Sequence, residues 1–131
     1  MTRQYLPDPL EVGKDLRKKP IAGLSMFFIN AGNFGDEVAE YIEFPDRNSF
    51  HIGASYERLQ ISYTKMKSQN TENPLEHVVN EVMNFAEQVK KGLDSKAPTT
   101  LEDAQYLDCW VTRVNKARKG EYSDKLNRER E

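Results

Sequence analysis

The sequence predicts an α+β fold, in which a short antiparallel sheet of three to four strands is followed by two C-terminal helices packed on one face. In the first half of the chain the apolar residues alternate or run together, whereas after residue 74 they follow helical spacing. The chain has 131 residues, a length typical of one domain. We divide it into an extended lead-in (1–20), a single α+β domain (21–120) and a frayed, charged tail (121–131).

The lead-in is predicted to be extended because it contains Pro7, Pro9 and Pro20. Proline disfavours helical geometry at the residue before it. Three apolar residues are able to anchor part of this segment to the domain: Leu10, Val12 and Leu16.

The strands are predicted from short apolar segments separated by turn residues. Residues 21–29 form a dense apolar run, residues 38–44 alternate, and residues 49–56 alternate most regularly. Between them, residues 31–36 contain Gly and Asn, which tolerate positive φ, and residues 45–48 begin with a proline. Both connecting segments are therefore predicted to be turns.

The alternation changes parity after Tyr56, where the apolar positions move from even to odd numbers. A strand has a strict period of two, so this change requires an extra residue. A β-bulge or bend at Glu57-Arg58 is therefore predicted.

The first predicted helix begins at Asn73, a good N-cap, with Pro74 at its first position, and ends at Gly92. Its inward residues are spaced as one helical face: Leu75, Val78, Val79, Val82, Ala86, Val89 and Leu93.

The second predicted helix begins near Pro98, is capped by Thr99 or Thr100, and ends at Gly120. Trp110 lies at the edge of its inward stripe, which consists of Leu101, Ala104, Leu107, Val111, Val114 and Ala117.

Composition narrows the class of protein. The formal net charge is −2, which argues against a nucleic-acid binder. No apolar run approaches the length of a membrane span, and the start of the chain lacks the apolar core of a signal peptide. A single cysteine, Cys109, excludes an internal disulfide. We therefore predict a soluble cytoplasmic protein.

No pattern of residues predicts a catalytic or metal site. Gly32 and Gly35 lack the spacing of a phosphate-binding loop. His51 and His77 lack the further ligands that zinc needs. Cys109 has no base to activate it and is predicted to be a small buried residue. We predict no catalytic residue, no metal and no cofactor, and a protein that is not an enzyme.

Basic residues provide the only predicted ligand-binding site, a patch for an anion. It consists of Arg17, Lys18, Lys19, Arg58 and Arg113. The alternative interpretation is that these cations solubilise the surface or stabilise helix C-termini.

The order of features from residue 36 onward resembles the C-terminal domain of the glucose-fructose oxidoreductase/inositol dehydrogenase-like family. Residues 37–46 are similar to that family's strand-and-turn unit. The helix with Phe85, Val89 and Gly92, and the Glu-Asp-Ala helix from residue 98 to 120, are similar to its closing helices. The resemblance implies an antiparallel sheet closed by two helices. The Rossmann domain and the family's catalytic motifs are absent from this sequence, so the resemblance assigns no catalytic residue.

Two functions are predicted. The first is a non-enzymatic interaction or oligomerisation module that uses the exposed, aromatic face of the sheet. Its partner would be a second copy of the chain or another protein. The alternative is a protein that binds or sequesters an anionic metabolite or nucleotide as an oligomer.

Overall fold

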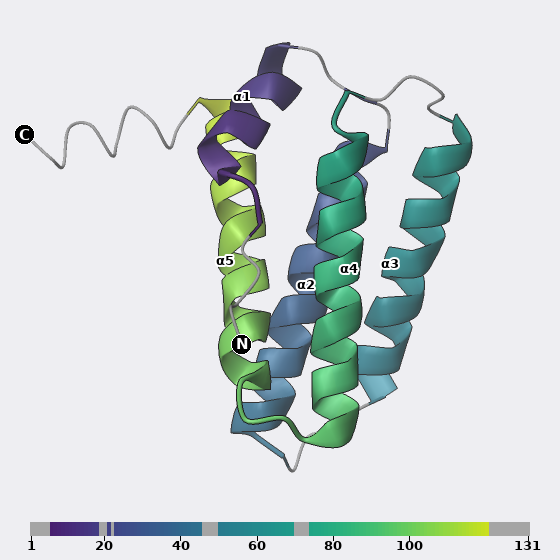
Figure 1. Ribbon diagram of the computed structural model, residues 1–131, viewed down its shortest axis with the longest axis vertical. Coiled ribbons are helices and arrows are strands. Elements are labelled where there is room, and N and C mark those ends of the chain that lie inside the picture. The colour runs from purple at the N-terminus through teal and green to yellow at the C-terminus, as the bar shows by residue number, and fades with distance from the viewer. Residues whose placement is uncertain (1–5, 19–20, 22, 46–49, 70–73, 121–131) are drawn as a thin grey trace, which may run out of the picture.

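The protein is a helical bundle, and the predicted α+β fold with its antiparallel sheet is wrong. The computed structural model describes residues 6–18, 21, 23–45, 50–69 and 74–120. These residues form α1 (Pro9–Lys18), α2 (Leu24–Glu43), α3 (Phe50–Gln69), α4 (Glu76–Ser95) and α5 (Thr100–Lys119), and they contain no strand (Figure 1).

The four long helices run up and down in chain order, each antiparallel to the next (Figure 1). Phe27 and Phe34 of α2 pack on Tyr63 and Tyr56 of α3, with ring centroids 5.9 Å and 5.2 Å apart. The earlier residue of α2 packs on the later residue of α3, so these two helices are antiparallel. Short connections between consecutive helices are typical of this topology.

Helix α2 contains the segments that were predicted to be a strand, a turn and a second strand. Its buried apolar residues recur at helical spacing: Leu24, Phe27, Phe28, Ala31, Phe34 and Val38. The predicted turn at residues 31–36 is wrong, because Gly32 and Gly35 lie inside the helix and face α5. A Cβ on Gly35 would lie 2.7 Å from the carbonyl oxygen of Ala104. The glycines therefore allow the two backbones to approach closely.

Helix α3 replaces the most regular predicted strand. Among the side chains of α3 whose burial is described, Ile52, Ser55, Leu59 and Met66 are buried, and they are three, four and seven positions apart. The parity change after Tyr56 is therefore the helical period itself, and no bulge exists at Glu57-Arg58.

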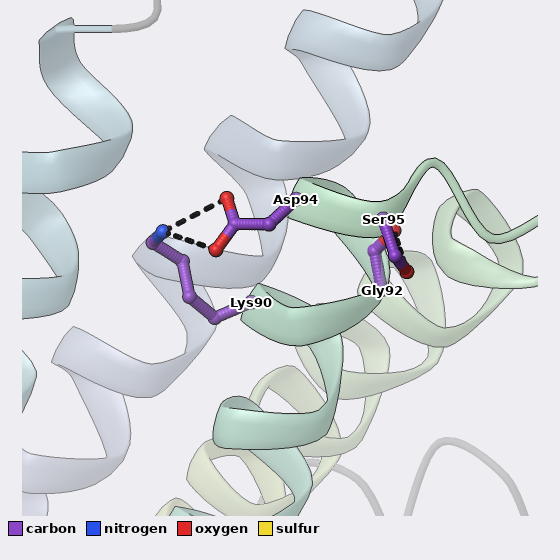
Figure 2. A network of polar contacts seen from close by, with 4 residues as sticks. All are labelled: Lys90, Gly92, Asp94 and Ser95. Atoms are coloured by element: carbon purple, nitrogen blue, oxygen red, sulfur yellow. Dashed lines mark hydrogen bonds and ion pairs between the residues drawn. The ribbon is translucent and has the colours of Figure 1, made fainter.

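The prediction of two C-terminal helices is confirmed, although α4 begins at Glu76, after the predicted Pro74, and the predicted cap Asn73 lies outside the described residues. Gly120 ends α5 with a φ of 79°, as its position predicted. Helix α4 continues past Gly92 to Ser95, and Lys96 ends it with a φ of 58°. Figure 2 shows this last turn, where the Nζ of Lys90 lies 3.0 Å from a carboxylate oxygen of Asp94. The Oγ of Ser95 donates to the carbonyl of Gly92 at 3.4 Å.

Part of the predicted extended lead-in is a helix. In α1, Val12 and Leu16 are buried, and Gly13 lies so close to α5 that a Cβ there would meet the carbonyl oxygen of Val114 at 2.6 Å. Pro9 occupies the first helical position, where its missing N–H costs nothing. The predicted tail, residues 121–131, lies outside the described residues.

Helix α1 lies parallel to α5. The indole Nε1 of Trp110 donates to the carbonyl of Pro7 at 2.6 Å, whereas Gly13 and Arg17 lie against later residues of α5. Helix α1 therefore packs against the second half of α5 (Figure 1). Leu6, just before α1, lies against the first half, where its backbone N–H donates to the hydroxyl of Tyr106 at 3.0 Å.

Candidate docking surface

One face of α5 is exposed and lies beside two hollows in the surface. Helices α2 and α1 both pack against the inner side of α5, so a line of side chains on its opposite face points outward. We call this line the outer stripe; it consists of Glu102, Gln105, Cys109, Thr112, Lys116 and Lys119, all exposed.

Two hollows flank the first half of the outer stripe. The α1-side hollow has a volume of about 430 Å³ and is bordered by Pro9, Tyr106 and Trp110. The α2-side hollow has a volume of about 310 Å³ and is bordered by Phe44 and several carboxylates of α2 and α5. Gln105 and Cys109 border both hollows, so the two hollows lie side by side and meet at these exposed residues of the stripe.

The hollows combine negative charge with apolar surface. Their carboxylates are Asp36, Glu40, Glu43, Glu102 and Asp108. Phe44, at the end of α2, is 54% exposed. Such a surface suits a partner that carries both cations and apolar side chains.

Charge is divided along the outer stripe. Its first half carries Glu102 beside the acidic hollows, and its second half carries Lys116 and Lys119. This division also stabilises α5 itself, because acids at a helix N-terminus and bases at its C-terminus oppose the helix dipole.

Asp108 is the most perturbed carboxylate of this surface. Partial burial raises its pKa above the usual 3.8, and the negative charge of Asp36 raises it further. A carboxyl group whose pKa is raised by folding destabilises the folded state when it is ionised.

Asp108→Asn is therefore expected to raise the melting temperature at pH 7. The destabilisation by the charged carboxylate is absent below its unfolded pKa and appears as the pH rises through the higher folded pKa. The difference in melting temperature between Asp108→Asn and the unchanged protein should thus shrink as the pH falls towards 4. Thermal unfolding of both proteins from pH 7 to pH 4, at low protein concentration, tests this. An equal difference at both ends would contradict the electrostatic explanation.

The predicted anion-binding residues lie in different places. Arg17 lies against Gly120 at the C-terminal end of α5, and Lys18 is exposed on the last turn of α1. Arg113 borders the α1-side hollow. Arg58 lies on α3, and Lys19 lies outside the described residues.

Arg58 takes part in a hydrogen-bonded chain between α2 and α3. Its Nη2 donates to the Oγ of Ser55 at 3.2 Å, and that hydroxyl donates to the Oε2 of Glu37 at 2.5 Å. Ser55 is only 1% exposed, so this chain satisfies a buried polar group. The geometry gives Arg58 a structural role between helices.

Cys109 is exposed, so the prediction of a small buried residue is wrong. His51 and His77 are exposed on α3 and α4. Within the described ranges, no group of three His, Cys, Asp or Glu side chains is arranged to hold a metal ion. In the same part of the chain, no helix is both long and apolar enough to cross a membrane.

Sequence reasoning missed the carboxylates of α2 on this surface because it placed Asp36 in a turn and Glu40 and Glu43 in a strand. The signal was present in helical spacing: Asp36, Glu40 and Glu43 are three and four residues apart and therefore share a helix face. Recognising α2 as one helix would have placed them together.

Comparisons with protein-family models, curated proteins and solved structures found no match to this chain. The resemblance to the oxidoreductase family stays a prediction.

Proposed function

We propose that this chain is a non-enzymatic protein-interaction module that docks a basic, partly apolar partner segment on the first half of α5. One observation carries the proposal: two hollows, joined across Gln105 and Cys109, place five carboxylates beside exposed aromatic surface. Charge complementarity steers such partners and selects among them.

The rest of the structure supports this choice. Fully buried side chains such as Phe27, Phe34 and Leu59 fill the bundle, so binding is better accommodated on the surface than between the helices. Both hollows are open to the surface and shared by several helices, which suits a macromolecular segment. An anionic ligand would meet mostly carboxylates there.

The single cysteine offers a direct test, because Cys109 lies between the two hollows. We expect an amphipathic helical peptide with lysine on one face and leucine on the other to slow the reaction of Cys109 with a thiol reagent several-fold. A matched peptide with glutamate in place of lysine should give no protection. Added salt should weaken the protection, because exposed charges are screened.

Substitution of carboxylates tests whether the peptide protects Cys109 by binding at the two hollows. The combined change Asp36→Asn, Glu43→Gln and Asp108→Asn should abolish protection by the basic peptide. Glu57→Gln, an exposed carboxylate on α3, removes charge elsewhere and should leave the protection unchanged. Equal protection in both proteins, or none from any basic peptide, would overturn the proposal.

A further inference from the structure

We propose that the partner is a second copy of this chain, which lies antiparallel across the outer stripe so that the acidic half of each α5 faces the basic half of the other. This inference rests on the proposed function, since it names the partner of the same surface.

The stripe is self-complementary only when reversed. Its midpoint lies between Cys109 and Thr112, and a two-fold axis there aligns Glu102 with the partner's Lys119. The same axis aligns Gln105 with the partner's Lys116. A parallel pair would instead align Glu102 with its own copy, and like charges opposite each other repel. Because the antiparallel arrangement is two-fold symmetric, it closes at a dimer.

Helix α1 also differs between the two halves of α5. It packs against the second half, near Val114 and Ala117, whereas the α1-side hollow lies beside the first half, between Glu102 and Arg113. The two-fold rotation keeps α1 on the same side and reverses its position along α5. Along the axis of α5, the α1 of each copy is therefore at the level of the other copy's α1-side hollow.

This arrangement also uses the basic end of α1. Arg17 lies beside Gly120, at the level of α5 that the rotation matches with Glu102 of the other copy. Lys18 lies on the same exposed turn. These two predicted anion-binding residues would then meet carboxylates of the second copy.

Exposed apolar side chains follow the same symmetry. On α2, Phe44 lies at the acidic end, whereas Met26 and Ile29, 57% and 37% exposed, lie towards the other end. Antiparallel pairing brings the Phe44 end of one α2 towards the Met26 and Ile29 end of the other. Asp108, whose pKa is raised by burial and by Asp36, would gain cations nearby.

The outer stripe spans 17 residue steps, or about 25 Å of helix at 1.5 Å per residue. With its flanks it suits an interface at the small end of the usual range, with weak and salt-sensitive association. Sedimentation equilibrium over a range of protein and salt concentrations should show a monomer–dimer equilibrium that weakens as salt increases.

Charge reversal tests the proposed alignment of Glu102 in one copy with Lys119 in the other. Glu102→Lys and Lys119→Glu should each weaken the dimer about tenfold, because each places like charges opposite at two symmetry-related points. Mixing the two variants should restore a heterodimer, since every pair is then complementary. Glu57→Lys on α3 and Lys91→Glu on α4 make the same charge changes at exposed positions elsewhere and should leave dimerisation unchanged. Helicity by circular dichroism confirms that each variant is folded.

Cys109 provides an independent measurement. In this register the two cysteines are three residue steps apart along the axes, about 4.5 Å, with helix axes about 10 Å apart. A short bis-maleimide should therefore link the two copies through Cys109. Cys109→Ser should abolish the covalent dimer, and Glu102→Lys alone should reduce it.

The outcomes separate this inference from the proposed function. A monomer at all concentrations, or a dimer that the stripe reversals leave unchanged, overturns the antiparallel dimer. If basic peptides still protect Cys109, the docking surface stands with a different partner. If neither dimerisation nor protection occurs, both proposals are wrong.

Discussion

Gly35→Ala is expected to destabilise the fold by about 3 kcal/mol, because the added methyl group has no room between α2 and α5. A Cβ at this position would lie 2.7 Å from the carbonyl oxygen of Ala104 and 3.2 Å from the amide nitrogen of Asp108. Both atoms belong to the backbone of α5, so relief requires the two helices to separate. Thermal unfolding should show a melting temperature lower by about 10 °C.

Gly53→Ala is the matched control. Gly53 lies on α3, is exposed, and a Cβ there would meet nothing within 4 Å. Alanine should stabilise α3 by about 0.5–1 kcal/mol, since glycine is the poorer helix former. If Gly35→Ala were as stable as Gly53→Ala, the close packing of α2 on α5 would be wrong.

Phe28→Ala is expected to cost about 3–5 kcal/mol, the range for emptying a large buried aromatic site. Phe28 is fully buried, and its ring packs edge-on against Trp110 with centroids 5.4 Å apart. Removing it leaves a cavity between α2 and α5 and takes away a neighbour of the indole that anchors Pro7. Urea unfolding, with the midpoint and slope both fitted, measures the decrease in the free energy of unfolding.

Phe44→Ala serves as the comparison for this second change. Phe44 is 54% exposed at the end of α2, so the loss of its ring should alter the free energy of unfolding by no more than about 0.5 kcal/mol. Its expected effect is on docking instead, because it borders the α2-side hollow. Similar destabilisation by the two substitutions would contradict the placement of Phe28 in the core.

The last two helices were predictable because their signals agree. In the segment from residue 74 to 120 the apolar period, the N-terminal prolines and the closing Gly120 all favour helix. Both ends of α4 differ from the prediction. The helix begins at Glu76 and not at Pro74, and Gly92 lies inside it, close to Thr100, so that the chain turns at Lys96.

The first half of the bundle was mispredicted because several helical positions also satisfied a period of two. Apolar residues at 50, 52, 54 and 56 alternate, yet Ile52, Leu59 and Met66 are seven apart and lie on one helix face. In α2, Gly32 and Gly35 were taken for a turn because glycine is common in turns. Their contacts with α5 supply the stabilisation that the low helix propensity of glycine lacks.

The sequence by itself determined the two C-terminal helices, the closing Gly120 and the acidic-to-basic order of charges along α5, because these depend on neighbours within a few residues. Only the tertiary structure decided that α2 and α3 are helices, that α1 covers half of α5, and that five carboxylates gather around Cys109. The physical reason is that close helix packing and a shared concave surface arise from contacts between distant segments, and local periodicity does not encode which segments meet.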